Sequence, residues 1–369
     1  MALRLPVSHW MFSFEPSVSA AEAGLKYVGD DELCIRRVRR GRSFQYLSSN
    51  GETLRAPRHL QRIKSLVIPP AWRDVRICGS ANGYLQAVGW DARGRKQYRY
   101  HARYRETRDQ VKFSRMIAFG TALALIRNAV SEDLRRTGLG KNKVIAVVMR
   151  LLESSLIRVG NDQYAEENES FGLTTMRNRH VRINGTSLMF RYRGKSGQEH
   201  VVEMTDRRLA NIVKQCRELP GYNLFEYQDV EGNVCRVCSD DVNRYIHEVA
   251  GKEFSAKDFR TWAGTVLAVR ELSAAGAAPN ATAEKKAVVE AVRNVAAKLG
   301  NRPAVTRKYY IHPAILDAYG DGSLFTTLQH GLEQHAAYSG LGLSPEEYAV
   351  MVIVARYQEN LALELRKAS

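Results

Sequence analysis

The sequence predicts an α+β protein with two domains: a small, mainly β domain at residues 1–105 and a larger, mainly α domain at residues 106–369. The first observation is length, because 369 residues exceed the size at which one hydrophobic core is usual. The second is a change of pattern, from alternating apolar residues in the first domain to helical spacing from residue 109 onward. An apolar share of 44% supports a substantial core.

Positive charge is concentrated at the start of the chain. The formal net charge is +16, and residues 1–105 carry 19 Lys or Arg against 8 Asp or Glu, a net +11. Such an excess favours a polyanionic partner, either nucleic acid or an acidic membrane surface. We therefore expect a polyanion to contact mainly the first domain.

The five cysteines form no disulfide framework, because their number is odd and their spacing irregular. Cys235 and Cys238 form a CxxC pair without a second pair or a nearby His pair, so no metal site is expected. No apolar run reaches the ~18 residues that a membrane span needs, and no clean signal-peptide core is present. We expect a cytoplasmic protein without membrane contact.

The first domain begins with a basic hairpin. Short strands are expected within residues 24–54, where five Arg lie between 36 and 42 and an Asn50-Gly51 turn follows. A helix is expected at about 57–65, before Pro69-Pro70. Further strands are expected around Val75, Ile77, Leu85 and Ala87, on either side of the Asn82-Gly83 turn.

The last segment of this domain, residues 91–108, has seven Lys or Arg interleaved with aromatic residues. Cations can contact phosphates while amphipathic aromatic rings lie against sugars or bases. The alternative is a solvated strand edge, whose charges prevent edge-to-edge aggregation. The candidate DNA-binding residues are Arg93, Arg95, Lys96, Tyr98, Arg99, Tyr100 and His101.

The second domain opens with helices from residue 109 and from Lys143. The Lys143 helix is expected to end at Gly160, which would place Arg158 in its last turn. Turn signals at Asn184-Gly185 and at 194–197 then predict a small three-stranded sheet inserted among helices, with Lys195 at its second tip.

Mainly helices follow this sheet. They are expected at about 205–217, at about 240–249 with Ser239 as cap, and from Ser255 onward. In the Ser255 helix, Phe259, Trp262 and Val266 share one face, so Arg260 is either a surface residue or a cation beside a buried wall.

The C-terminal third is expected to contain a linker, two helices and a turn. The linker is predicted at 273–283 from its small residues, and a helix at about 284–299. Gly300-Asn301 is expected to form a C-cap and turn. The last helix should run from Pro345 to about Arg366, with Ser344 as its N-cap and Glu347 at N3.

Residues 300–313, GNRPAVTRKYYIHP, place a Tyr pair beside Arg307, Lys308 and His312. Tyr310 is the candidate nucleophile. A phenol has a pKa of about 10, so it needs cationic neighbours that stabilise the charge of the group it attacks, as a phosphodiester would require. The alternative is a pair of tyrosines that only pack.

Several common catalytic motifs are absent from the sequence. It contains no GxxxxGK[ST] loop, no GxGxxG and no HExxH, and no tight set of carboxylates for two-metal chemistry. If this protein cuts a phosphodiester, we therefore expect it to use neither a metal nor ATP, and no other cofactor.

Five motifs in order resemble the bacterial, poxvirus-like type IB DNA topoisomerases: IRVGN (157–161), FGLTT (171–175), FRYRGKSG (190–197), KDFRTWAGT (257–265) and RKYYIHP (307–313). PPAW and DARGRKQYRYH in the first domain also match. The resemblance implies a catalytic domain like that of tyrosine recombinases. It also implies relaxation of supercoiled duplex DNA by transient single-strand cleavage, through a 3′-phosphotyrosine, followed by religation.

The resemblance further implies a catalytic pentad of Arg158, Lys195, Arg260, Asn301 and Tyr310. The two arginines would hold the non-bridging oxygens, and Lys195 would protonate the leaving 5′ oxygen. Poxvirus and cellular relatives have His where this chain has Asn301, and an amide can donate a hydrogen bond but cannot titrate near pH 7. Arg307 and Lys308 then become DNA-backbone contacts.

Two alternatives remain open from the sequence. Tyrosine recombinases share the Arg-Lys-Arg-Tyr set, but they usually have His at the places held here by Lys257 and Thr261. A non-enzymatic DNA-packaging protein would need only the basic first domain. Under the resemblance we expect a monomeric, nucleoid-associated clamp on duplex DNA, with a hinge near residues 105–109.

Overall fold

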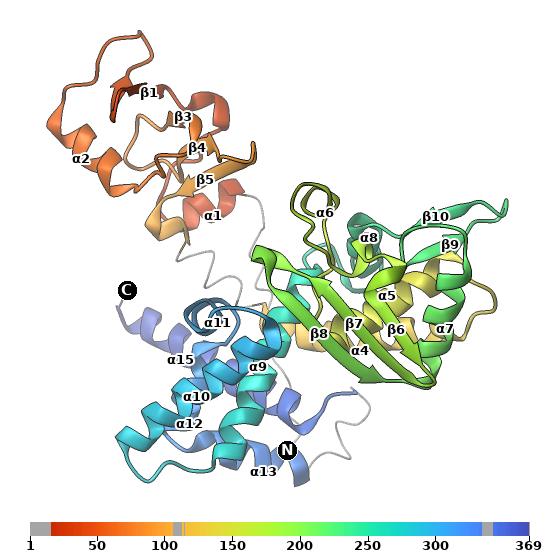
Figure 1. Ribbon diagram of the computed structural model, residues 1–369. Coiled ribbons are helices and arrows are strands. Elements are labelled where there is room, and N and C mark those ends of the chain that lie inside the picture. The colour runs from red at the N-terminus through yellow and green to blue at the C-terminus, as the bar shows by residue number, and fades with distance from the viewer. Residues whose placement is uncertain (1–15, 106–112, 114, 334–341, 369) are drawn as a thin grey trace. The chain divides into compact units, whose positions relative to one another are not determined.

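The computed structural model describes residues 16–105, 113, 115–333 and 342–368. Two compact units are distinguished, Met1–Phe113 and Ser114–Ser369. The expected mixture of helices and strands is confirmed, with a sheet in the first unit and a mainly helical second unit (Figure 1). The expected hinge falls largely on residues 106–109, which lie outside the described residues.

The first unit is an antiparallel five-stranded sheet in the order β2-β1-β3-β4-β5. Buried residues of both faces include Ile77 and Ala87 on one side and Leu85 and Val88 on the other. Helix α2 packs Ile63 against the first of these clusters, and α1 packs Ala20 against the second. The elements are α1 (Pro16–Glu22), β1 (Ile35–Arg40), β2 (Ser43–Leu47), α2 (Pro57–Ser65), β3 (Arg73–Ile77), β4 (Leu85–Trp90) and β5 (Lys96–Tyr100).

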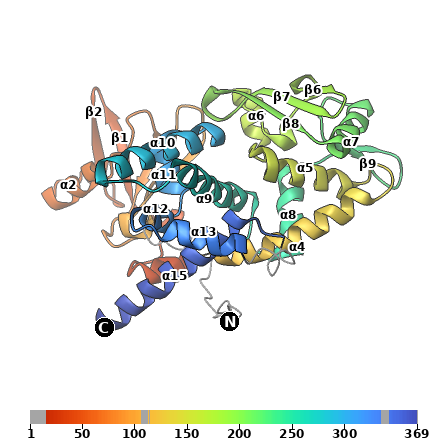
Figure 2. The ribbon, with the colours of Figure 1, turned by 90° about the horizontal axis from the view of Figure 1, so that it is seen from below.

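The second unit packs helices around the buried α5 and α9, and Figure 2 shows α9 beside α10 and α12. Its helices are α4 (Met116–Arg135), α5 (Lys141–Ser155), α6 (Asp162–Asn168), α7 (Arg207–Glu218), α8 (Ser239–Ala250), α9 (Ala256–Ala275), α10 (Ala281–Leu299), α11 (Pro303–Tyr309), α12 (Pro313–Gly320), α13 (Ser323–Glu333) and α15 (Pro345–Ala368). None of the helices in the described part of the chain combines the length and apolar character needed to cross a lipid bilayer.

Two small sheets lie among these helices. One has the order β6-β7-β8, with strands Val181–Asn184, Ser187–Arg193 and Glu199–Thr205, and Lys195 lies in a 3₁₀ turn between β7 and β8. The other pairs β9 (Glu226–Gln228) with β10 (Val234–Arg236). Strict alternation along β7 buries Leu188, Phe190 and Tyr192 against the helical core.

The expectation that Arg158 lies in the last turn of a helix is wrong. Helix α5 ends at Ser155, and Leu156 adopts the left-handed conformation with φ 58°. This conformation ends the helix, so Arg158 stands in an irregular segment that leads to Asn161, the N-cap of α6. The backbone carbonyls of Leu156, Arg158 and Val159 accept hydrogen bonds from distant parts of the chain instead of from a following helical turn.

Two helix boundaries also differ from expectation. Ser239 is the first residue of α8 rather than its cap, because the Asp241 carboxylate accepts the backbone N–H of Cys238 at 3.1 Å and makes Cys238 the cap. The expected linker at 273–283 is shorter, since α9 continues to Ala275 and Asn280 caps α10. Alanine has the highest helix propensity, so this Ala-rich segment extends both helices.

Helix α9 is fixed by a buried ion-pair network. Arg127 on α4 donates to Glu347 on α15 at 2.7 Å and to Glu153 on α5 at 2.6 Å. The indole of Trp262 on α9 donates to the same Glu347 at 3.1 Å. Three helices therefore meet at the Glu347 carboxylate, and Glu153 joins α5 to them through Arg127. As expected, Glu347 also caps α15 by accepting the N–H of Ser344.

Buried histidines make the stability of the second unit sensitive to acid. His312 is 2% exposed, its Nδ1 accepts the Ala314 N–H, and burial lowers its pKa to about 4. The folded protein holds this ring neutral, whereas the unfolded chain protonates it near pH 6.5. The stabilisation is therefore complete above pH 6.5 and is lost as the pH falls toward 4.

Replacing His312 by Asn should reduce this acid sensitivity, because an amide can cap α12 but does not titrate. We expect the free energy of unfolding of His312→Asn to fall by about 2 to 3 kcal/mol less than that of wild type between pH 7.5 and 4.5. Urea unfolding at the two pH values measures this difference. His247→Asn, which replaces an exposed histidine on α8, serves as the control and should follow wild type.

Candidate active site

Arg260 is a buried cation at the centre of the second unit. It is 5% exposed, which rules out a surface position and places it beside the buried wall of α9. Its guanidinium donates to the carbonyl of Leu156, just after α5, and to that of Leu299 at the end of α10, at 2.5 Å for the latter. One side chain thus joins the two segments that lead to Arg158 and Asn301.

The charge of Arg260 faces the candidate nucleophile. Its guanidinium carbon lies 5.8 Å from the centre of the Tyr310 ring. Burial, and after it the positive charge of Arg158, lowers the pKa of Arg260 to about 10, while the Tyr310 phenol opposes this shift. The group stays protonated at neutral pH. Its buried Nε has no hydrogen-bond partner within the described residues, so one donor remains available.

Arg158 is positioned by contact between two sequence motifs, IRVGN and FGLTT. The Arg158 carbonyl accepts the N–H of Leu173 at 2.9 Å, and Thr174 donates its N–H to Val159 at 2.7 Å. The backbones approach so closely that a Cβ on Gly172 would lie 2.5 Å from the Arg158 oxygen. This contact fixes the backbone at Arg158 and explains why a glycine stands at 172.

Arg158 and Asn301 are joined directly, although 143 positions separate them in the chain. The Arg158 guanidinium donates to Asn301 Oδ1 at 2.6 Å. Asn301 follows Gly300, whose φ of 58° ends α10, and its N–H bonds to the Ala296 carbonyl at 2.9 Å. With its oxygen occupied, the amide keeps a buried Nδ2 that has no partner in the described part of the chain.

Tyr310 stands just after α11 and is fixed to α9 through its backbone. The Thr265 hydroxyl donates to the Tyr310 carbonyl at 3.2 Å and accepts the N–H of His312 at 3.1 Å. A Cβ on Gly264 would lie 2.6 Å from the same carbonyl, so only glycine permits this approach. Tyr309, the last residue of α11, lies under the Lys308 ammonium at 5.2 Å.

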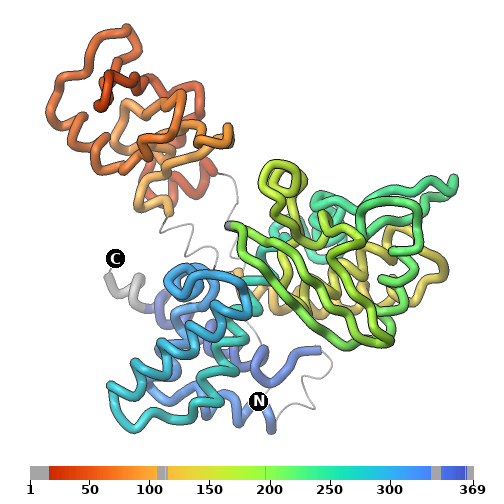
Figure 3. Tube along the Cα trace, viewed as in Figure 1, coloured from red at the N-terminus to blue at the C-terminus, as the bar shows by residue number. Residues whose placement is uncertain are grey.

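Lys195 is exposed, and its ammonium has no hydrogen-bond or ion-pair partner among the described residues. The hairpin that carries it, between the β7 and β8 strands traced in Figure 3, nevertheless lies against the turn that carries Asn301. The contact is made by His200 of β8, whose ring lies against both Gly194 and Gly300. Four of the five candidate residues are therefore joined by contacts, and Lys195 approaches them through its hairpin.

Sequence reasoning did not identify Gly264, Thr265 or His200 as parts of this site. Gly264 and Thr265 lie within KDFRTWAGT at four and five positions after Arg260, on the face that meets Tyr310. This helical spacing could have predicted that Gly264 lies on the same face of the helix as Arg260. His200 follows the FRYRGKSG motif, and nothing in its own neighbourhood indicates a contact with residue 300.

The candidate DNA-binding residues of the first unit gather at one sheet edge, because β5 pairs only with β4. Several already have partners: Arg95 pairs with Asp91 at 2.6 Å, Lys96 pairs with Asp30, and Arg99 lies over the Trp72 ring. Tyr98 is 41% exposed and stacks on Tyr100. Arg93 lies in the β4–β5 turn and His101 follows β5. In the second unit, Arg307 and Lys308 are exposed on α11.

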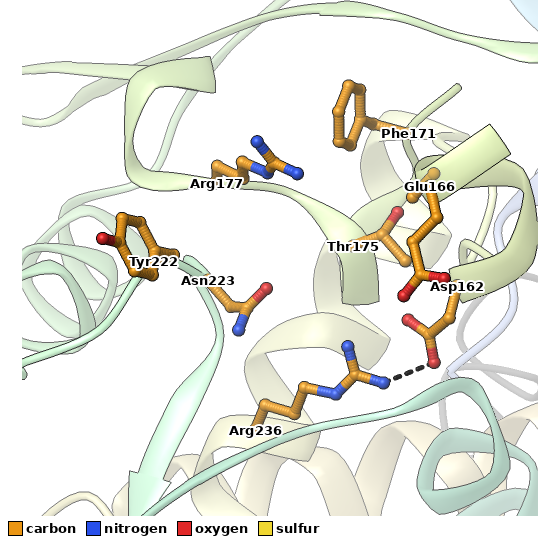
Figure 4. A pocket seen from close by; sticks show the side chains of 9 residues that line it. Asp162, Glu166, Phe171, Thr175, Arg177, Tyr222, Asn223 and Arg236 are labelled. Carbon is orange, nitrogen blue, oxygen red and sulfur yellow. Dashed lines mark hydrogen bonds and ion pairs between the residues drawn. The ribbon is translucent and has the colours of Figure 1, made fainter. Parts of the chain in front are cut away.

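One pocket of the second unit lies beside α6. It has a volume of about 380 Å³ and is lined by none of the five candidate catalytic residues (Figure 4). Arg236 and Asp162 form an ion pair across it, as the dashed line shows, and Arg177 lies over the Phe171 ring at 5.4 Å. Within the described ranges, no group of three or more His, Cys, Asp or Glu could hold a metal ion.

The chain is similar to known DNA topoisomerases over most of its length. The family described as eukaryotic DNA topoisomerase I, catalytic core, matches residues 101–330, and the family described as bacterial DNA topoisomerase IB, N-terminal domain, matches residues 43–91. DNA topoisomerase 1B of Acanthamoeba polyphaga mimivirus is 30% identical over 79% of this chain and 89% of its own length. DNA topoisomerase 1B of vaccinia virus strain Copenhagen is 23% identical over 73% of this chain and 80% of its own.

The catalytic-core match covers more than half of the chain, and it contains every residue of the cluster around Arg260. The mimivirus relative is matched over most of its length. The chain therefore belongs to the type IB DNA topoisomerase family.

Proposed function

We propose that this protein relaxes supercoiled duplex DNA by cutting and rejoining one strand through a 3′-phosphotyrosine at Tyr310. The observation that carries the proposal is the buried Arg260. Its guanidinium bonds to the segments that position Arg158 and Asn301, and it faces the Tyr310 ring. A cationic, donor-rich cluster beside a phenol is suited to an anionic phosphoryl transition state.

In the cleavage step, the Tyr310 phenol releases its proton to water, its oxygen attacks the phosphorus, and the bond to the 5′ oxygen breaks. Arg158 and Arg260 hold the non-bridging oxygens, and their planar donor forks match phosphate geometry. Nδ2 of Asn301 and Nε of Arg260, which have no partner among the residues that the structure describes, supply further donors to the same anion. Each such donor typically contributes ~3 to 4 kcal/mol to lowering the barrier.

Lys195 donates the proton that the leaving 5′ oxygen requires. Its ammonium is exposed on the hairpin tip, where an arriving DNA strand can meet it. Religation reverses the steps: the 5′ hydroxyl attacks the phosphotyrosine, and Lys195 takes the proton back. Because the energy of the broken phosphodiester is kept in the phosphotyrosine, neither ATP nor a metal is required.

We further infer that the helical unit uses the active-site plan of tyrosine recombinases, with the inserted sheet β6-β7-β8 delivering the lysine. Family membership favours the topoisomerase over the recombinase, as does the presence of Lys257 and Thr261 where recombinases usually have His. The first unit would act as the DNA clamp, and the protein would work as a nucleoid-associated monomer. The basic edge at β5 supports this role for the first unit.

A first test of the proposed function separates the two tyrosines. Wild type incubated with supercoiled plasmid in EDTA without ATP should yield relaxed topoisomers and a covalent complex that SDS traps. Tyr310→Phe should form no adduct, because it lacks the attacking oxygen, whereas Tyr309→Phe should retain the adduct. Gel analysis after SDS and protease treatment provides the measurement. Adduct formation by Tyr310→Phe, but not by Tyr309→Phe, would reverse the assignment.

A second prediction concerns the fork of Arg260. Lysine keeps the charge at 260, but its donors all lie on one nitrogen and cannot reproduce the planar fork that reaches the Leu156 and Leu299 carbonyls from two separate nitrogens. Arg260→Lys should therefore lower the single-turnover cleavage rate by about two to three decades. Arg270→Lys is the matched control. Arg270 is an exposed residue of the same helix as Arg260, pairs with Glu346 of α15, and its lysine variant should cleave like wild type. A wild-type rate for Arg260→Lys would refute the role.

A third prediction concerns salt. If Arg307 contacts a DNA phosphate, Arg307→Ala should make the log-log dependence of binding on salt shallower by about 0.9. Lys286 lies near the opposite end of α10 from Asn301, and Lys286→Ala should leave the slope unchanged. Fluorescence anisotropy with a short duplex at several salt concentrations measures both. Equal slopes for wild type and Arg307→Ala would exclude this contact.

A further inference from the structure

The imidazole of His200 lies between two turns that carry candidate catalytic residues. A Cβ on Gly194, the residue before Lys195, would lie 2.6 Å from His200 Cδ2 and 2.7 Å from Nε2. A Cβ on Gly300, the residue before Asn301, would overlap His200 Cε1. The ring therefore fills the space left by two missing side chains.

The backbone at Gly194 does not itself require glycine. Its φ of −99° and ψ of −162° form an extended conformation that any residue adopts, so the absent side chain is explained by the imidazole. Gly300 is different, because its φ of 58° also favours glycine. Gly194 is thus the position at which the packing of His200 can be tested alone.

Several other groups hold the His200 ring in place. It stacks on Tyr192 of β7 with centroids 5.1 Å apart and planes at 14°, and Tyr192 itself is 6% exposed. Burial, followed by the charges of Arg158 and Arg260, lowers the pKa of His200, and Glu199 on the same strand opposes the shift. The two guanidinium groups near the ring favour the neutral imidazole over the protonated one.

We propose that His200 is a positioning residue that holds the Lys195 hairpin tip against the Asn301 turn by filling the space between Gly194 and Gly300. The inference rests on the proposed function, since it assigns His200 a role through Lys195. The tip is otherwise exposed at Lys195, and His200 is the described side chain that lies against glycines of both turns. Displacing a catalytic group by about 1 Å can reduce a rate about 100-fold.

A substrate with sulfur in place of the 5′ bridging oxygen can separate this role from general damage. A thiol has a pKa of about 8.5, so the sulfur leaves as a thiolate and does not need the proton from Lys195. His200→Ala should cleave the oxygen substrate about 10- to 100-fold more slowly than wild type. On the sulfur substrate most of this loss should disappear, as it should for Lys195→Ala.

Two further variants serve as controls, one for the shape of the side chain at position 200 and one for the integrity of strand β8. His200→Phe keeps a flat ring that can stack on Tyr192 and fill the same space, so it should retain most of the wild-type rate. Val201→Ala alters the next residue of β8, which is 54% exposed, and should cleave both substrates like wild type. Covalent adduct formed in a single turnover is the readout throughout.

The glycine gives an independent test of the contact. Gly194→Ala should slow cleavage of the oxygen substrate, because its methyl group collides with the imidazole and displaces the tip. Adding the same methyl group to His200→Ala should cause little further loss, because the smaller side chain leaves room for it. Strictly multiplicative losses in the double variant would show that the two positions act independently, and would overturn the contact.

The outcomes distinguish the inference from the function on which it rests. An active wild type with His200→Ala equal to Val201→Ala would overturn the inference alone. So would equal losses of His200→Ala on the oxygen and sulfur substrates, or His200→Phe as slow as His200→Ala. No adduct from the folded wild type on either substrate would overturn the proposed function, and the inference with it.

Discussion

The structure of the second unit depends on the burial of one charge, the guanidinium of Arg260. A buried cation is strongly unfavourable unless hydrogen bonds compensate for the water it loses. Here the compensation comes from two backbone carbonyls at helix ends, those of Leu156 and Leu299. The need to satisfy the charge therefore fixes how α5, α9 and α10 meet. The same geometry brings Arg158, Asn301 and Tyr310 together.

The remaining contacts show how separate motifs form one site. The FGLTT backbone donates hydrogen bonds to the backbone of IRVGN and fixes the position of Arg158. KDFRTWAGT contributes Arg260 on one helical turn and Thr265 on the next, so a single helix both faces the Tyr310 ring and bonds to its carbonyl. The network around Glu347 then fixes α9 in the unit. Few of these contacts are local in sequence.

Local patterns in the sequence predicted most helices and the antiparallel strands, because helical periodicity, alternation and turn signals are short-range. The end of α5 was mispredicted because Leu156 adopts the left-handed conformation, which leucine rarely does, and its carbonyl accepts a hydrogen bond from Arg260, 104 positions away. The motifs named the residues of the candidate site, but not their partners. His200 was missed for the same reason, since its contact with Gly300 exists only after folding.

The attachment of Tyr310 to α9 has a mechanical consequence. Its backbone is held by the Thr265 hydroxyl and by the close approach of Gly264, and neither contact involves the phenol. A DNA strand linked to that phenol would therefore be tethered to the helical core rather than to a loop. Torque from an unwinding duplex would pass into α9 and the helices packed on it. Rotation would then be confined to the free 5′ end, while the tethered end keeps its alignment for rejoining.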